Sequence, residues 1–344
     1  MCKQKINNRY EWIDVAKGIS ILLVMWGHVV VIHDALYNWV TSFHVPVFLV
    51  ITGFLLSVTK KQTSSFKKTF EKIIRPYWVF SLISIVTDFG SSYYSGGGTA
   101  AVKSFLIDCY KVISCYGIHA LWYLSSYLIA MWIYLYLLKD LKSLRLLSFV
   151  IVSFGMGIAL SEGNKYFIQL FPSKVFYLVN FPVTALVRAV VCAALIAIGH
   201  YVYLFLRFSR IINGLLGGTL LAFSFLISLV SDSSNFSIVD YGKHPILFLF
   251  VAISGAVGLL LILRSFECRW SIFQYFGRNS LLFLVTHHSL KITYLSVAIT
   301  KLFISGENGA FGLIALCILV SIDSLIVELI KHKFPLMIYV NNDV

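Results

Sequence analysis

Long apolar runs alternate with short polar or basic segments along almost the whole chain of 344 residues. Because about 20 apolar residues make a helix long enough to cross a bilayer, each run predicts a transmembrane helix. The ten predicted helices cover residues 13–33, 38–58, 76–95, 119–138, 146–161, 183–203, 211–230, 245–263, 279–299 and 309–330. The pattern predicts an all-α, polytopic membrane protein, with one transmembrane domain over residues 1–344 and no appended soluble domain.

The polar segments between these runs predict loops and surface helices. The stretch SYYSGGGTA (92–100) predicts a flexible loop, followed by a short surface helix over 101–116. Phenylalanine and isoleucine recur at helical spacing among lysines over 60–75, which predicts an amphipathic helix on the inner leaflet. Two segments rich in Tyr, Phe, Asn and Ser, 162–182 and 231–244, predict outer loops that suit either a sugar-like ligand or the membrane interface.

Composition and charge agree with a membrane protein and orient it. The chain is 59% hydrophobic and 12% charged, whereas soluble domains carry about 25% charged residues. With both termini in the cytoplasm, 19 of the 28 Lys and Arg residues fall in cytoplasmic segments, as the positive-inside rule requires. We therefore expect cytoplasmic termini, a membrane-lipid environment and no nucleic-acid partner, since no basic segment is long enough to form a soluble domain.

The sequence predicts neither a cleaved signal peptide nor a metal site. The first apolar run is long and lacks a small-residue cleavage pattern, so we expect it to remain as a membrane span rather than a signal peptide. The six cysteines are scattered without metal-ligand spacing, so we expect no metal. The oligomeric state is left open.

The first predicted helix carries three ionisable residues on one stripe, Asp14, Lys17 and His28. Lys17 and His28 lie roughly 16 Å apart along the helix axis and about 20° apart around it. Charged groups at membrane depth are costly and usually mark function. In one interpretation Lys17 reaches the interface and pairs with Asp14, while His28 bonds to a neighbouring helix. In the other, His28 transfers protons near neutral pH, for which His is the best-matched side chain.

Other predicted helices place further polar groups in the membrane. The turn between the first two helices is short, so we expect His44 to approach His28 between their outer ends. Arg188, in the outer part of the sixth helix, is costly unless paired or hydrated and is a candidate to line a cavity. The ninth predicted helix carries three polar residues at i, i+7 and i+11, on one face: Ser280, His287 and Lys291.

Four short motifs, in this order, resemble those of the acyltransferase 3 family of membrane acyltransferases. DVAKGISILLVMWGH (14–28) is similar to the first-helix signature, in which an Asp precedes a basic residue and Gly, and ten residues separate the basic residue from a His. FHVPVFLVITGFLLS (43–57) resembles the second-helix pattern, with Thr52 where Ser is usual. HALWYLSSYL (119–128) and FGRNSLLFLVTH (276–287) resemble the later segments. The Lys-Gly form of the first motif is most similar to the fucose 4-O-acetylase-like branch.

The resemblance implies an O-acetyltransferase of the bacterial cytoplasmic membrane. Members move an acyl group, usually acetyl, from cytoplasmic acyl-CoA to a hydroxyl of a glycan or lipid-linked sugar. It makes His28 the first catalytic candidate, as a base or as an acyl carrier, and adds His44 and His287. Acetyl-CoA would be held by basic and acidic residues near the cytoplasm: Asp14, Lys17, Lys72 and Arg75. The family's Arg-x-x-Arg is here the partial match Lys72-x-x-Arg75.

Two rival functions remain open at this point. Buried ionisable stripes also mark proton-coupled transport, so a transporter or flippase of a glycan precursor is the rival from another class. Within enzymes, the rival is transfer of a different acyl group such as succinyl. A transferase consumes its acyl donor and leaves an ester, whereas a carrier leaves its substrate chemically unchanged.

Overall fold

The computed structural model describes residues 10–30, 34–58, 63–170, 173–205, 208–232, 234–304 and 309–335. Over these residues the fold is all-α, with no strand beyond an isolated bridge between Asn235 and Asp240. The elements are α1 (Glu11–Gly27), α2 (Ala35–Val58), α3 (Thr63–Ile113), η1 (His119–Leu121), α4 (Trp122–Ile133), η2 (Tyr134–Leu138), α5 (Ser143–Leu170), α6 (Ser173–Phe205), α7 (Arg210–Ser228), η3 (Phe236–Ile238), α8 (Pro245–Phe266), α9 (Ser271–Arg278), α10 (Ser280–Ser289), α11 (Ile292–Phe303) and α12 (Gly309–Lys333).

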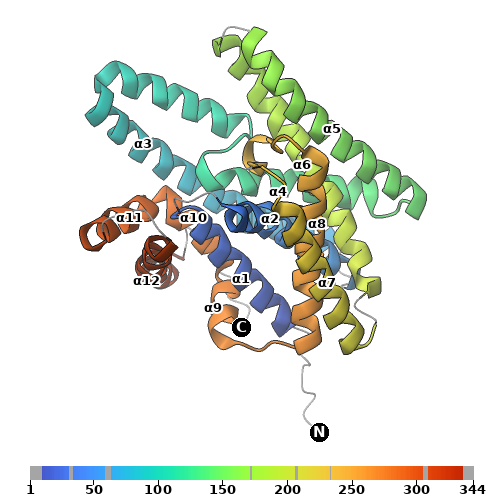
Figure 1. Ribbon diagram of the computed structural model, residues 1–344. Helices are drawn as coiled ribbons and strands as arrows, with labels where there is room; N and C mark the ends of the chain where they lie inside the picture. The colour runs from blue at the N-terminus through green and yellow to red at the C-terminus, as the bar shows by residue number, and fades with distance from the viewer. Residues whose placement is uncertain are drawn as a thin grey trace.

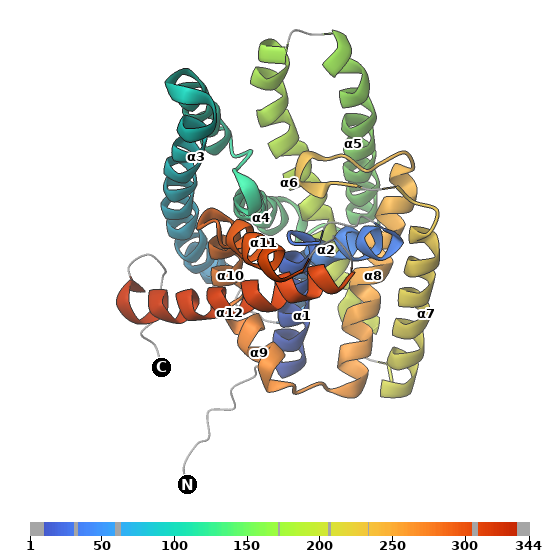
Figure 2. The same ribbon diagram turned by 60° about the vertical axis from the view of Figure 1, so that its left-hand side comes forward.

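The helices run in two main directions. α1 lies at the centre, and α7 and α8 lie side by side to one side of it (Figure 1). α2 and α12 run crosswise to α1, α7 and α8 (Figure 2), so the helices do not form a parallel bundle. α3 extends outward, turns and returns towards α4 (Figure 1). The crossing of α1, α2 and α10 near the centre is where the polar residues of the motifs gather.

Glycines allow the closest helix crossings. A Cβ atom on Gly18 of α1 would lie 1.9 Å from the carbonyl oxygen of Phe273 in α9, and one on Gly277 would lie 1.8 Å from the carbonyl oxygen of Asp14. The two helices therefore touch backbone to backbone. Gly53 of α2 meets α6 in the same way. The glycines of the first and last motifs thus have a packing role.

Within the described ranges, seven helical segments are long and apolar enough to cross a membrane. They are α2, the η1–α4–η2 segment from His119 to Leu138, α5, α6, α7, α8 and α12. The bent pair α10–α11 would make an eighth. α1 forms as predicted but ends at Gly27, so His28 follows the helix rather than lying within it; the predicted end of this helix, at 31–33, lies outside the described residues.

Two predicted loops are wrong. Residues 92–100 do not form a loop, because α3 is helical from Thr63 to Ile113 except for a sharp break at Gly97, whose φ of 76° only glycine adopts readily. α3 therefore also includes the predicted helices over 60–75, from residue 63, and 101–116. The predicted loop over 162–182 is helical wherever it is described, since polarity alone does not stop a helix with a hydrogen-bonded backbone.

The ninth predicted helix is also different in the structure. It is broken between α10 and α11, which meet at an angle of 67°. Lys291 stands at the break with a left-handed backbone, φ 58°. The prediction that Ser280, His287 and Lys291 share one helix face is therefore wrong, because α10 ends before Lys291 and α11 continues at an angle to it.

Candidate active site

Three cavities follow one another through the centre of the molecule. The lysine cavity, about 310 Å³, is lined by Lys17 of α1, Lys72 of α3 and Ser280 of α10. The central cavity, about 340 Å³, is lined by His28 and His44. The Asp88 cavity, about 380 Å³, is lined by residues of α3, the segment after it, and α6.

Neighbouring cavities share walls. Val24, Val45, Tyr123 and Leu284 line both the lysine cavity and the central cavity. The central and Asp88 cavities likewise share three residues: His119, Trp122 and Ser237. The central cavity therefore lies between the other two, separated from each by a few side chains.

Imidazole rings gather at the central cavity. His28 follows the end of α1 and is exposed in the space that it lines. Its ring centroid lies 5.2 Å from those of His287 and His288, which are adjacent in α10. His288 in turn stacks on His119 at 4.3 Å. The structure thus brings the three predicted catalytic histidines to one region, with His28 and His44 on the cavity wall and His287 against His28, and adds His119 and His288.

Hydrogen bonds fix the tautomers of several of these rings. His44 Nδ1 lies 2.9 Å from the carbonyl oxygen of Val40, and His287 Nδ1 lies 2.6 Å from that of Phe283. A carbonyl oxygen only accepts, so Nδ1 donates in each case, and in the neutral ring Nε2 is left with a free lone pair. His44 also lines the central cavity with His28, and it presents this unprotonated nitrogen in the same region.

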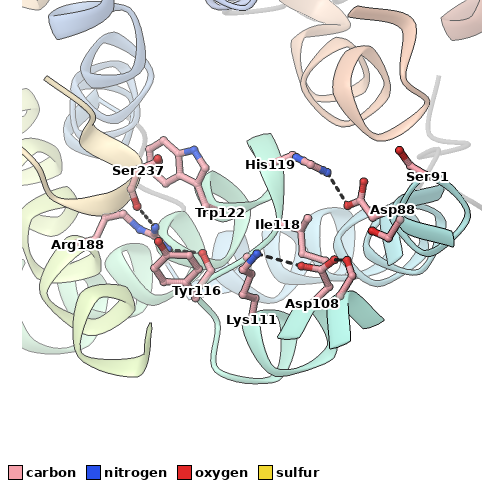
Figure 3. Close-up of a pocket in the computed structure, with 13 residues that line it drawn as sticks. Asp88, Ser91, Asp108, Lys111, Tyr116, Ile118, His119, Trp122, Arg188 and Ser237 are labelled. Carbon is pink, nitrogen blue, oxygen red and sulfur yellow. Dashed lines mark hydrogen bonds and ion pairs between the residues drawn. The ribbon is translucent and has the colours of Figure 1, made fainter. Parts of the chain in front are cut away.

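Asp88 of α3 lines the Asp88 cavity and bonds to His119, which also lines the central cavity. Its Oδ2 accepts a hydrogen bond of 2.8 Å from His119 Nε2, and its Oδ1 pairs with Lys291 Nζ. Both partners have left-handed backbones, with φ of 50° at His119 and 58° at Lys291. Non-glycine residues rarely adopt this conformation, and it tends to occur at functional sites. Figure 3 shows His119 directed at Asp88 across the mouth of the Asp88 cavity.

Arg188 is fully buried and bonded on every side. Its Nε donates to Ser126 Oγ at 2.7 Å. Its Nη1 donates to the carbonyl oxygen of Ser237, and its Nη2 to the carbonyl oxygen of Tyr116 at 2.7 Å (Figure 3). The guanidinium also lies 4.9 Å from the Trp122 ring centroid. Arg188 therefore lies on the wall of the Asp88 cavity, as expected, but it ties α6 to two connecting segments rather than facing a ligand with free donors.

The predicted donor-binding residues are only partly together. Lys17 and Lys72 line the lysine cavity. Asp14 is buried and forms an ion pair of 3.5 Å with Arg278 of α9. Arg75 is exposed one turn beyond Lys72 on α3 and does not belong to the cavity lining described above. The cationic end of the cavity is thus built by Lys17 and Lys72.

Sequence reasoning missed Asp88 and His288. Asp88 is an isolated carboxylate inside the apolar run over 76–95, which is the same signal that singled out His28. His288 follows His287 directly and was overlooked beside the residue that matches the family motif. The pairing of Asp88 with Lys291 and the stacking of His288 on His119 do not follow from sequence spacing, because α3 and η1 are both distant in sequence from α10 and from Lys291 just after it.

The fold and the site define a polytopic membrane protein with an imidazole cluster between a basic cavity and a polar one. A family model described as an acyltransferase domain matches residues 10–327, nearly the whole chain. The chain therefore belongs to the acyltransferase 3 family, which makes it an acyltransferase embedded in a membrane. Searches among curated proteins and among solved structures found no match.

Proposed function

We propose that this protein transfers an acetyl group from cytoplasmic acetyl-CoA to a hydroxyl of a glycan or lipid-linked sugar. The observation that carries the proposal is the series of three adjoining cavities. A basic cavity suits the donor, a polar cavity with aromatic and carboxylate groups suits a sugar, and His28 lies between them. The Lys17–Gly18 form of the first motif supports a place in the fucose 4-O-acetylase-like branch.

The donor enters at the lysine cavity in this proposal. Acetyl-CoA carries phosphates, for which lysine is a suitable point charge. The rest of the cavity wall is largely apolar, with Phe48, Tyr123 and Tyr127 along it. Such a wall suits the uncharged arm that carries the thioester. With the phosphates at Lys17 and Lys72, the thioester points towards the central cavity and His28.

His28 has two possible roles in the reaction, and both conserve atoms. As a base, it takes the proton from the acceptor hydroxyl while the hydroxyl oxygen attacks the acyl carbon and the carbon–sulfur bond breaks; the thiolate then receives that proton. As a carrier, a ring nitrogen of His28 first takes the acyl group from the thioester and then passes it to the hydroxyl. His44 and His287 support the ring cluster in either case.

The proposed location is the bacterial cytoplasmic membrane, with both termini in the cytoplasm. The distribution of basic residues supports this orientation. The ten proposed crossings are the seven candidate spans, the bent pair α10–α11, α1 and the apolar part of α3 near 76–95. Among them, α2 and α12 run crosswise to α1, α7 and α8 (Figure 2), so their two crossings are the first to test. Reporter fusions in the segments between the helices test this topology.

The function is tested by measuring O-acetyl esters on the surface glycan of the producing cells. NMR spectra before and after mild alkali are compared for cells with the wild-type gene, without the gene, and with His28→Ala at matched protein level. We expect acetyl esters with the wild type only. Acetylation that survives His28→Ala overturns the role of His28. Acetyl esters that do not depend on the gene overturn the proposed acetyl transfer.

Transport of a glycan precursor is the second candidate, and one observation favours it. The break between α10 and α11 resembles the interrupted helices that transporters use to build binding sites. The same cells separate the two functions when the glycan amount is also measured. A flippase changes how much glycan reaches the surface, whereas a transferase changes only its ester content.

A further inference from the structure

The Asp88–His119 pair is not needed for any step assigned above, yet it is built like a catalytic pair. A carboxylate only accepts hydrogen bonds, so its contact with His119 Nε2 requires that nitrogen to carry the proton. In the neutral ring, Nδ1 then has a free lone pair and can take a proton. A carboxylate that fixes the tautomer and orientation of a histidine base is the arrangement of hydrolytic triads.

The pair stands at the passage between two cavities. His119 lines both the central cavity, which contains His28, and the Asp88 cavity. Its side chain is 21% exposed and that of Asp88 is 16% exposed, so a ligand in either cavity can reach His119. Arg188, Lys111 and Asp108 also line the Asp88 cavity, but Lys111 and Asp108 pair with each other at 3.0 Å, and Arg188 is bonded to oxygens of the protein.

We propose that His119, in place of His28, is the base that takes the proton from the acceptor hydroxyl, and that Asp88 is its positioning residue. The inference rests on the proposed acyl transfer and assigns the acceptor to the Asp88 cavity, with the reacting hydroxyl at His119. A polyhydroxylated acceptor fits this cavity, since serine hydroxyls, carboxylates and the Trp122 ring are the groups that bind sugars. His28 is then left to the donor side.

Acyl transfer takes place in one step, and no atom is left unassigned. The acceptor oxygen attacks the acyl carbon of the thioester, its proton moves to His119 Nδ1, and the carbon–sulfur bond breaks. The thiolate departs towards the lysine cavity and receives, by way of His28, the proton that His119 has taken from the acceptor. His288, whose ring contacts both His28 and His119, lies between the two rings on the route of this proton. The products are the ester and the free thiol.

The test uses the full-length protein in lipid nanodiscs, in which both faces are open. Radiolabelled acetyl-CoA is the donor, and the acceptor probe is glycan from cells lacking the gene, treated with mild alkali. General-base catalysis contributes about 10²–10⁴-fold. We therefore expect His119→Ala to lower kcat by about that factor, with little change in the KM for acetyl-CoA, and added imidazole to restore at least part of it.

Substitutions at Asp88 separate a positioning role from a structural link. Asp88→Asn keeps a hydrogen-bonding group of the same size but favours the wrong tautomer of His119, so we expect kcat to fall by about 10²-fold or more. Asp88→Glu restores the carboxylate and should recover part of the activity. Asp232→Asn is the matched control, because Asp232 is likewise an aspartate paired with a lysine, Lys243, but lines none of the three cavities. We expect this variant to retain nearly full activity.

The outcomes distinguish this inference from the proposed function. A wild-type protein that does not acetylate the glycan overturns the proposed function and with it the role of His119. An active wild type with an equally active His119→Ala or Asp88→Asn overturns only the inference. A loss in His119→Ala that imidazole does not restore also overturns it, because a base that is merely absent can be replaced from solution.

Discussion

The close crossing of α1 and α9 allows a quantitative prediction for Gly18→Ala. An added Cβ would lie 1.9 Å from the carbonyl oxygen of Phe273 and 2.7 Å from its carbonyl carbon. Both are backbone atoms, so they cannot rotate away, and α1 and α9 have to separate. Because α1 carries Lys17 and ends next to His28, this separation would also disturb the wall of the lysine cavity.

Two opposing effects set the size of the change. Alanine is favoured over glycine inside a helix by about 1 kcal/mol. Overpacking of a close contact costs about 1–3 kcal/mol, and the overlap with backbone atoms places Gly18→Ala at the upper end of that range. We therefore expect a net loss of about 1–2 kcal/mol in the free energy of unfolding. For a chain of this size, that corresponds to a decrease of roughly 1–3 °C in Tm.

The assay is thermal unfolding in detergent, compared with a matched glycine elsewhere. Gly218 lies within α7, and a Cβ there would meet nothing within 4 Å. Gly218→Ala should leave Tm unchanged or raise it, since only the helix preference acts. A Gly18→Ala protein as stable as Gly218→Ala would refute the reasoning, and the glycine of the first motif would then need a role in chemistry.

The remaining predictions concern the cavities and the buried arginine. Lys17→Gln combined with Lys72→Gln should raise the KM for acetyl-CoA about tenfold or more, because each lysine offers a charged hydrogen bond to phosphate; kcat should change little, and steady-state kinetics with acetyl-CoA as the varied substrate measure both values. Val24→Trp adds bulk to the wall shared by the lysine and central cavities. This variant should abolish acetyl transfer while labelled acetyl-CoA still binds. Equal losses of binding and transfer would contradict the idea that the acyl group passes from the lysine cavity to the central cavity. Arg188→Met leaves Ser126 and two carbonyl oxygens without their donor, so the free energy of unfolding should fall by about 3 kcal/mol, measured as a lower Tm.

The sequence predicted the helices better than their ends and breaks. Apolar runs identify buried or lipid-facing helices because burial dominates their energy, and α2 and α8 start and end close to the predicted positions. The break at Lys291 and the continuation of α3 through 92–96 depend on tertiary contacts and backbone conformation, which an apolar pattern does not carry. Gly97 was recognisable as a turn residue, but its effect is a helix break and not a loop.

For the site, motif residues were predictable and their neighbours were not. His28 and His44 were expected to approach each other, and both line the central cavity. Their roles stay predictions. Asp88 and Lys291 lie about two hundred positions apart in sequence, and only the fold shows that they form a pair. A sequence pattern has no means of joining such distant helices unless the residues belong to a known motif.

The hydrogen-bonding state of each buried polar group separates structural from chemical roles in this protein. Burying an unpaired polar group costs free energy, so a group that serves only structure should be fully bonded. Arg188 meets this condition, with donors engaged by three oxygens from different segments. The imidazoles do not, since His287 Nε2 and His288 Nδ1 have no hydrogen-bond partner among the described residues. Arg188 is therefore part of the structural framework of the site, whereas the buried, unpaired nitrogens of His287 and His288 beside His28 are groups that a purely structural role does not explain.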